Sequence, residues 1–151
     1  SESGNRALGN RSILADPRNP HIKNIINLTI KKREDFRPFA PSVMIEHYRD
    51  YFDTNQSSPY MSRIVKVKSD KIPGVTHVDN TSRIQTVDSK DNPRFYELIQ
   101  WFHVITGIPM LLNTSFNCQE PIVETPEDAI NTFKNTNLDI LVIDDYIIRK
   151  S

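Results

Sequence analysis

Residues 108–117, Ile-Pro-Met-Leu-Leu-Asn-Thr-Ser-Phe-Asn, change from an apolar run to a polar one within ten positions. The short apolar run 108–112 is typical of a buried strand. The polar residues that follow offer hydroxyls and amides where that strand ends, and open sheets commonly bind ligands at the carboxyl ends of their strands. Ser115 and Asn117 are two residues apart, so in an extended chain their side chains point to the same side. This stretch predicts a sheet with a polar ligand site at its edge.

The flanking sequence alternates between helical and strand-like periodicity. Apolar spacing of three and four residues predicts helices, and alternation in period two predicts strands. Helices are expected over 21–28 and 93–106 and from Thr125, and strands over 61–68, 83–88, 108–112, 138–143 and 146–148. Residues 43–45 form either a brief strand or the entry to a helix in the stretch 45–52. Together they predict one α+β (α/β) domain, residues 1–151, built on a twisted mixed β-sheet with flanking helices.

Two helix starts carry specific signals. Asn92 and Pro93 predict the cap and first position of the helix 93–106, in which the spacing of the aromatic residues, Trp101 included, predicts a place in the core. Thr125-Pro126-Glu127-Asp128 has the pattern of a capping box.

Composition narrows the class of protein. The chain has 151 residues, 37% hydrophobic and 25% charged, which is typical of one folded domain. No apolar run approaches the roughly 20 residues of a membrane span. The single cysteine, Cys118, excludes an internal disulfide and a zinc site built on cysteines, and is interpreted as a passive thiol of a cytoplasmic protein. Gly4 and Gly9 enclose a predicted loop at the start of the sequence. Because the sequence starts inside this loop, we expect it to be a fragment of a longer protein.

Positive charge is concentrated at the beginning of the chain. Residues 1–37 contain eight Lys or Arg and four acids, whereas the remaining residues contain 11 bases and 15 acids. A basic region in a protein of zero net charge favours a specific anionic ligand over a broad nucleic-acid surface, and a solvated charged surface is the alternative.

Four polar segments interrupt the predicted elements, and they share a chemistry. They are residues 6–12, 31–42, 76–85 and 113–117. Arginine presents a planar fork and lysine a point charge to phosphate, and serine and asparagine add hydrogen bonds. This combination suits a nucleotide or an acyl phosphate, and it lacks the nucleophile that a hydrolase would carry. His77 and Asp79 share a strand face, but without a third ligand a buried hydrogen-bonded pair is favoured over a metal site.

These segments resemble, in order and spacing, the C-terminal domain of the O-carbamoyltransferases that modify nodulation factors and antibiotics. The family begins this region with Gly-Pro-Arg-Ala-Leu-Gly, and residues 4–9 here read Gly-Asn-Arg-Ala-Leu-Gly. The resemblance continues through residues 37–42, 77–85, 113–123 and 125–129, and so covers essentially the whole chain. Asn5 stands where the family commonly has proline, and the link from Asn117 to Glu120 is shorter than usual.

The resemblance implies a fold, a reaction and partners. The family's C-terminal domain is similar to the threonylcarbamoyl-adenylate synthases (the YrdC-like fold). It implies that carbamoyl phosphate and ATP, with Mg²⁺, are converted to carbamoyl-adenylate and pyrophosphate. An N-terminal domain absent from this chain, related to the tRNA threonylcarbamoyl-transfer enzymes, would hold a metal and pass the carbamoyl group to a hydroxyl. No metal site is expected in residues 1–151 themselves.

The resemblance also implies roles for individual residues. The Lys-x-Arg and Ser-x-Asn signatures of the synthases match residues 31–33 and 115–117. Catalytic roles fall on Lys31, Arg37 and Arg83, and substrate or nucleotide binding on Arg6, Lys31, Arg33, Arg37, Arg83, Ser115 and Asn117.

Two other functions remain open at this point. An RNA- or nucleotide-binding module without catalysis would show tight, salt-sensitive binding to RNA, although the net charge of zero and the lack of stacking aromatic residues in the basic segments argue against it. A structural domain that has lost its chemistry is the third reading.

Overall fold

The computed structural model describes residues 12–31, 39–115, 125–143 and 146–150. Within them the chain forms an α+β fold, which confirms the predicted class. The elements in chain order are β1 (Ser12–Ala15), α1 (Ile22–Ile25), the π-helix η1 (Ile26–Ile30), β2 (Ala40–Met44), α2 (Tyr48–Tyr51), β3 (Phe52–Asp53), β4 (Arg63–Val67), the 3₁₀ helix η2 (Pro73–Val75), β5 (Thr81–Val87), α3 (Pro93–Thr106), β6 (Met110–Ser115), α4 (Pro126–Lys134), β7 (Ile140–Ile143) and β8 (Tyr146–Arg149).

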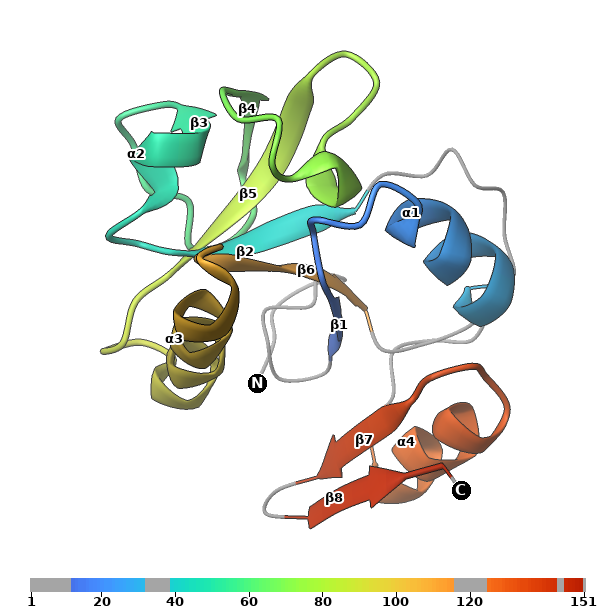
Figure 1. Ribbon diagram of the computed structural model, residues 1–151. Helices are drawn as coiled ribbons and strands as arrows, with labels where there is room; N and C mark the ends of the chain where they lie inside the picture. The colour runs from blue at the N-terminus through green and yellow to red at the C-terminus, as the bar shows by residue number, and fades with distance from the viewer. Residues whose placement is uncertain (1–11, 32–38, 116–124, 144–145, 151) are drawn as a thin grey trace.

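The main sheet is mixed, with six strands in the order β1-β6-β2-β5-β4-β3 (Figure 1). Strand β2 runs parallel to β5, and every other neighbouring pair is antiparallel. Strands β7 and β8 form a separate antiparallel hairpin beside α4. Sequence neighbours β5 and β6 are separated in the sheet by β2, so strands from three distant parts of the chain meet at its centre.

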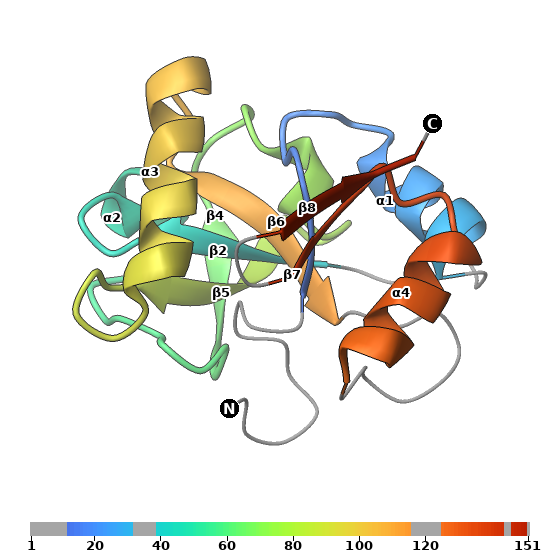
Figure 2. The ribbon, with the colours of Figure 1, turned by 90° about the horizontal axis from the view of Figure 1, so that it is seen from below.

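Helix α3 covers part of one face of the main sheet, as the view from below shows (Figure 2). Phe95 and Ile99 of the helix pack with Met44, Val87 and Leu111 of the sheet. The predicted bounds of this helix, 93–106, are confirmed.

The prediction that Trp101 lies in the core is wrong, because its side chain is 60% exposed. Helix α3 carries two apolar stripes, and the sheet buries the stripe that contains Phe95 and Ile99. Leu98 and Ile105, on the same side of α3 as Trp101, are exposed as well.

The opposite face of the sheet carries the larger core. Ile26 and Ile30 of η1 pack there with sheet residues that include Val43, Ile84 and Leu112. Phe133 of α4 and Leu141 of β7 belong to the same cluster, so the hairpin and α4 share this core with the sheet. No helix in the described ranges is both long enough and apolar enough to cross a lipid bilayer.

Several helix ends follow the signals in the sequence. The Thr125 hydroxyl accepts a hydrogen bond from the Asp128 amide at 3.1 Å, as the capping box predicts. Gly107 ends α3 in the left-handed region at φ +80°, which glycine adopts without steric cost. Asn92 stands at the cap position of α3, but its side chain makes no capping hydrogen bond.

Gly74 lies where no side chain fits. Its amide donates to the Pro17 carbonyl at 2.9 Å, and a Cβ would stand 2.5 Å from Cγ2 of Ile22 and 2.9 Å from the Pro17 oxygen. Gly74→Ala is expected to lower the free energy of unfolding by about 1–3 kcal/mol, measured by urea denaturation, because α1 must shift. Gly107→Asn, which keeps the left-handed conformation, should change it by less than about 1 kcal/mol. An equally small effect of Gly74→Ala would contradict this packing.

Candidate active site

Lys31 and Ser115, separated by 84 residues in sequence, are in direct contact. The Lys31 ammonium donates to the Ser115 carbonyl oxygen at 2.6 Å and to the Ser115 hydroxyl at 3.0 Å. The Lys31 side chain is only 1% exposed, whereas Ser115 is half-buried. A buried ammonium is costly unless polar groups surround it. The fold therefore places one predicted cation against one predicted hydroxyl at the end of β6.

A local irregularity of the helix delivers Lys31 to this position. The Lys31 amide donates to the Ile26 carbonyl at 2.7 Å, five residues back, which is the π-helical pattern. Such turns inside a helix are frequently found at functional sites. Ile26 and Ile30 of the same turn are buried in the core, so the segment that ends in Lys31 is anchored against the sheet.

The direction of the strands corrects one expectation about this edge. The sequence predicts a site at carboxyl strand ends, and β6 does end there, at Ser115. Because β2 and β5 run antiparallel to β6, their amino ends share the same edge. Strand β1 also begins there, with Ser12 paired to Ser115. Residues from three of the four polar segments, namely Ser12, Ala40 and Ser115, thus lie at one edge of the sheet.

Arg83 lies at this edge too, near the start of β5. It is half-buried and pairs with Ile64 of β4. Strand β5 is two positions away from β6 in the sheet, or about 10 Å at the usual strand spacing. The other predicted site residues, Arg6, Arg33, Arg37 and Asn117, lie outside the described residues, so their roles remain predictions.

His77 and Asp79 adjoin β5 but do not form a buried pair. Asp79 is exposed, and its carboxylate accepts from the Thr81 hydroxyl at 2.6 Å; the His77 ring lies 3.4 Å from the same hydroxyl. The prediction of a buried pair is wrong, because Thr81 stands between the two side chains. Within the described part of the chain, no three His, Cys, Asp or Glu residues cluster as metal ligands do.

Burial lowers the pKa of His77, and the nearby positive charges of Lys23 and Arg83 lower it further. The negative charge of Asp79 raises the pKa, but by less than burial lowers it. The folded protein therefore holds this proton less tightly than the unfolded chain. The free energy of unfolding should be greatest above the unfolded pKa of about 6.5 and should fall as the pH drops through the lower folded value. Urea titrations between pH 8 and pH 5 measure this slope.

His77→Gln should flatten that pH dependence, because the titrating group is removed. The same substitution at the exposed His21 is the control, and it should leave the slope in place. An unchanged slope in His77→Gln would contradict the assignment to this residue.

A hollow lies away from this edge. A cleft of about 710 Å³ is lined by Ile45, Glu46, Tyr48, Arg49, Asn55, Gln56, Ser57 and Arg63. Ile45 and Glu46 follow the carboxyl end of β2, and the five residues of β2 span about 16 Å. None of the predicted site residues lines the cleft, so we locate the candidate active site at the opposite end of the sheet.

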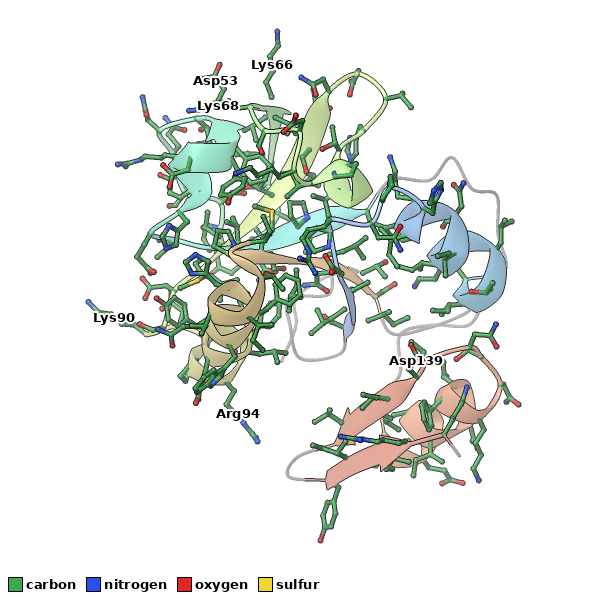
Figure 3. All side chains as sticks on the ribbon, viewed as in Figure 1. Asp53, Lys66, Lys68, Lys90, Arg94 and Asp139 are labelled. Atoms are coloured by element: carbon green, nitrogen blue, oxygen red, sulfur yellow. The ribbon has the colours of Figure 1, made fainter. Side chains whose placement is uncertain are left out.

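Other basic side chains of the described residues lie on the surface. Figure 3 shows Lys66 extending outward at the β3–β4 edge and Lys90 and Arg94 extending outward near the start of α3. The Lys68 ammonium donates to the Arg49 carbonyl at 2.8 Å. All four side chains are exposed. Lys31 is different because it is both buried and directed at a predicted ligand residue.

Three buried polar residues behind this edge belong to the predicted polar segments, but the sequence assigned none of them an individual role. Ser42, Gln85 and Asn113 are hydrogen-bonded to one another across β2, β5 and β6. In the sequence, each of them is a polar residue at a position of a central strand where the alternation places a buried side chain. Ser12, the partner of Ser115, was missed because four-residue strands such as β1 have little periodicity.

The chain belongs to the family described as the carbamoyltransferase C-terminus, whose model matches residues 1–150. It is 50% identical to the nodulation protein NolNO of Sinorhizobium fredii and 48% identical to NolO of Bradyrhizobium diazoefficiens, over 99% of its length in each case. It is 35% identical to a 3′-hydroxymethylcephem-O-carbamoyltransferase of Amycolatopsis lactamdurans over 95% of its length. The chain spans only 23%, 29% and 28% of these three relatives.

Proposed function

We propose that this chain binds carbamoyl phosphate and ATP with Mg²⁺ and forms carbamoyl-adenylate for transfer to a hydroxyl group. Membership in the carbamoyltransferase C-terminus family supports the reaction class. The observation that carries the proposal is the buried Lys31 ammonium held at the Ser115 hydroxyl, at the edge where the basic and polar segments join the sheet. Fixed cations and hydroxyl groups of this kind suit phosphate ligands.

The atoms of the reaction balance in two steps. Hydrolysis of carbamoyl phosphate by one water releases inorganic phosphate and leaves carbamate. A carbamate oxygen then attacks the α-phosphorus of ATP, forming a new phosphorus–oxygen bond, and the bond to the β-phosphate bridge breaks to release pyrophosphate. Negative charge spreads over the phosphoryl oxygens, so catalysis consists mainly of positioning and charge stabilisation.

Each described site residue has a part in this scheme. Lys31 neutralises charge on a phosphate and is held in place by its bond to the Ser115 carbonyl. The Ser115 hydroxyl hydrogen-bonds the nucleotide phosphate or the carbamoyl group. Arg83 binds carbamoyl phosphate and later the adenylate. Arg6, Arg33, Arg37 and Asn117 complete the anion-binding set.

We place this chain at the C-terminal end of a longer cytoplasmic transferase. An N-terminal domain with its own metal would take the carbamoyl group from the adenylate to the acceptor hydroxyl. The relatives are several times longer than the matched region, which leaves room for such a domain. A closed path between the two sites would protect the labile adenylate from water.

The experiment is a measurement of pyrophosphate released from ATP by the purified chain and by the complete polypeptide that contains it. Release that requires carbamoyl phosphate, with one phosphate formed for each pyrophosphate, is the expected result. Release without carbamoyl phosphate would indicate hydrolysis of ATP to AMP and pyrophosphate, and would contradict the proposal. No release and no ATP binding by the folded complete polypeptide would contradict the proposal.

A further inference from the structure

Three buried polar side chains connect the central strands of the sheet. Ser42 of β2, Gln85 of β5 and Asn113 of β6 are all almost fully buried. The Ser42 hydroxyl donates to Oε1 of Gln85 at 2.6 Å. Nδ2 of Asn113 donates to the Ser42 hydroxyl at 2.9 Å and to Oε1 of Gln85 at 3.2 Å. The three side chains therefore form a closed triangle of hydrogen bonds.

This triangle, the Ser42–Gln85–Asn113 network, lies directly behind the candidate active site. Ser115 is two residues beyond Asn113 on β6, and Arg83 is two residues before Gln85 on β5. Side chains two apart on a strand share a face, so the network and these site residues lie on the same face of the sheet. Ala40, two residues before Ser42, begins β2 at the same edge.

Burial alone does not explain why the positions of Ser42, Gln85 and Asn113 carry polar side chains. Met44, Val87 and Leu111 lie two residues further from the site on the same strands and face, and they form an apolar core with α3. Well-packed apolar side chains would stabilise these network positions without the cost of removing polar groups from water. What a closed hydrogen-bonded network adds is a single arrangement of the strands that carry it.

We infer that Ser42, Gln85 and Asn113 are positioning residues, which hold Ser115 and Arg83 at the separation that the reaction requires. The inference rests on the proposed function. The network acts on these two residues through the strands that carry them, β6 for Ser115 and β5 for Arg83. A displacement of about 1 Å in an active site can lower the rate roughly 100-fold, so a small slip of one strand against another would be costly for catalysis.

The test uses paired variants in the complete polypeptide. Ser42→Ala removes the hydroxyl that donates to Gln85 and accepts from Asn113, whereas Ser42→Thr retains a hydroxyl. Gln85→Met removes the shared acceptor with little change in volume. The control is Thr86→Val, which removes the acceptor of the Ser58 amide (2.9 Å) and lies on the opposite face of the same strand.

Ser42→Ala and Gln85→Met are expected to lower kcat for pyrophosphate release at least about 10-fold, with KM for ATP changed less than about threefold. Ser42→Thr should restore most of the rate, and Thr86→Val should leave it within about twofold of the wild type. Equal losses of kcat in Ser42→Ala and Thr86→Val, or no loss in Ser42→Ala, would overturn the inference.

A second readout separates this inference from the proposed function. Hydrogen exchange of the backbone amides at residues 83–85 and 113–115 should speed up in Ser42→Ala and not in Thr86→Val. If the wild type releases no pyrophosphate but this exchange pattern appears, the reaction assignment fails and the network still fixes the strand ends. Unchanged exchange in Ser42→Ala would overturn the network's role whatever the reaction.

Discussion

Lys31→Met is expected to lower the rate of carbamoyl-phosphate-dependent pyrophosphate release by about 10²–10³-fold, the usual loss when one preorganised charge donor is removed. Methionine fills a similar volume without the charge. Since the Lys31 side chain is almost fully buried, the apolar replacement should leave the protein folded, with a free energy of unfolding within about 1 kcal/mol of the wild type. The rate comes from a coupled pyrophosphate assay, and the folding from urea denaturation.

Lys23→Met is the matched control for this variant. Lys23 lies in α1, and its ammonium donates to the Thr76 carbonyl at 2.7 Å, so the substitution removes the same kind of bond elsewhere. The rate should stay within about twofold of the wild type, because no predicted ligand residue is involved. Equal losses in the two variants would show that Lys31 acts through stability and would contradict its role at the phosphate.

Ile84→Ala is expected to lower the free energy of unfolding by about 3 kcal/mol, a large part of the 5–15 kcal/mol of a typical domain. Ile84 is fully buried at the centre of the larger core, where the sheet leaves little room to collapse around a cavity. The midpoint of urea denaturation should fall while its slope stays unchanged.

Ile64→Ala on the neighbouring strand is the control for that substitution. Ile64 pairs with Arg83, directly beside Ile84, but its side chain is 59% exposed. The same chemical change should therefore cost less than about 0.5 kcal/mol. Comparable losses at the two positions would contradict the assignment of sheet faces on which the site geometry depends.

The sequence predicted the elements that have strong local signals. The spacing of Phe95 and Ile99 with Gly107 at the end defined α3, and the Thr125 cap defined the start of α4. The polar segment after the apolar strand predicted Ser115 as a site residue, and the structure places Lys31 against it. These features are local or depend on chemistry that residue type alone determines.

What the sequence could not predict depends on pairing between distant strands. The choice between the two apolar stripes of α3, which left Trp101 exposed, is decided by the sheet that the helix meets. Because β6 runs antiparallel to β2, the edge of the sheet at the carboxyl end of β6 also carries the amino end of β2. The Ser42–Gln85–Asn113 network exists only once that register is formed, so no single segment reveals it.

The most direct test of the central claim is a calorimetric titration of the chain with ATP and Mg²⁺ in the presence of carbamoyl phosphate. Saturable binding at one site, weakened at least about 10-fold by Lys31→Met and Ser115→Ala and unchanged by Lys23→Met, is the predicted result. The complete polypeptide, titrated in parallel, should bind through the same two residues. Binding that survives both substitutions in either protein would contradict a nucleotide site at the edge formed by η1 and β6.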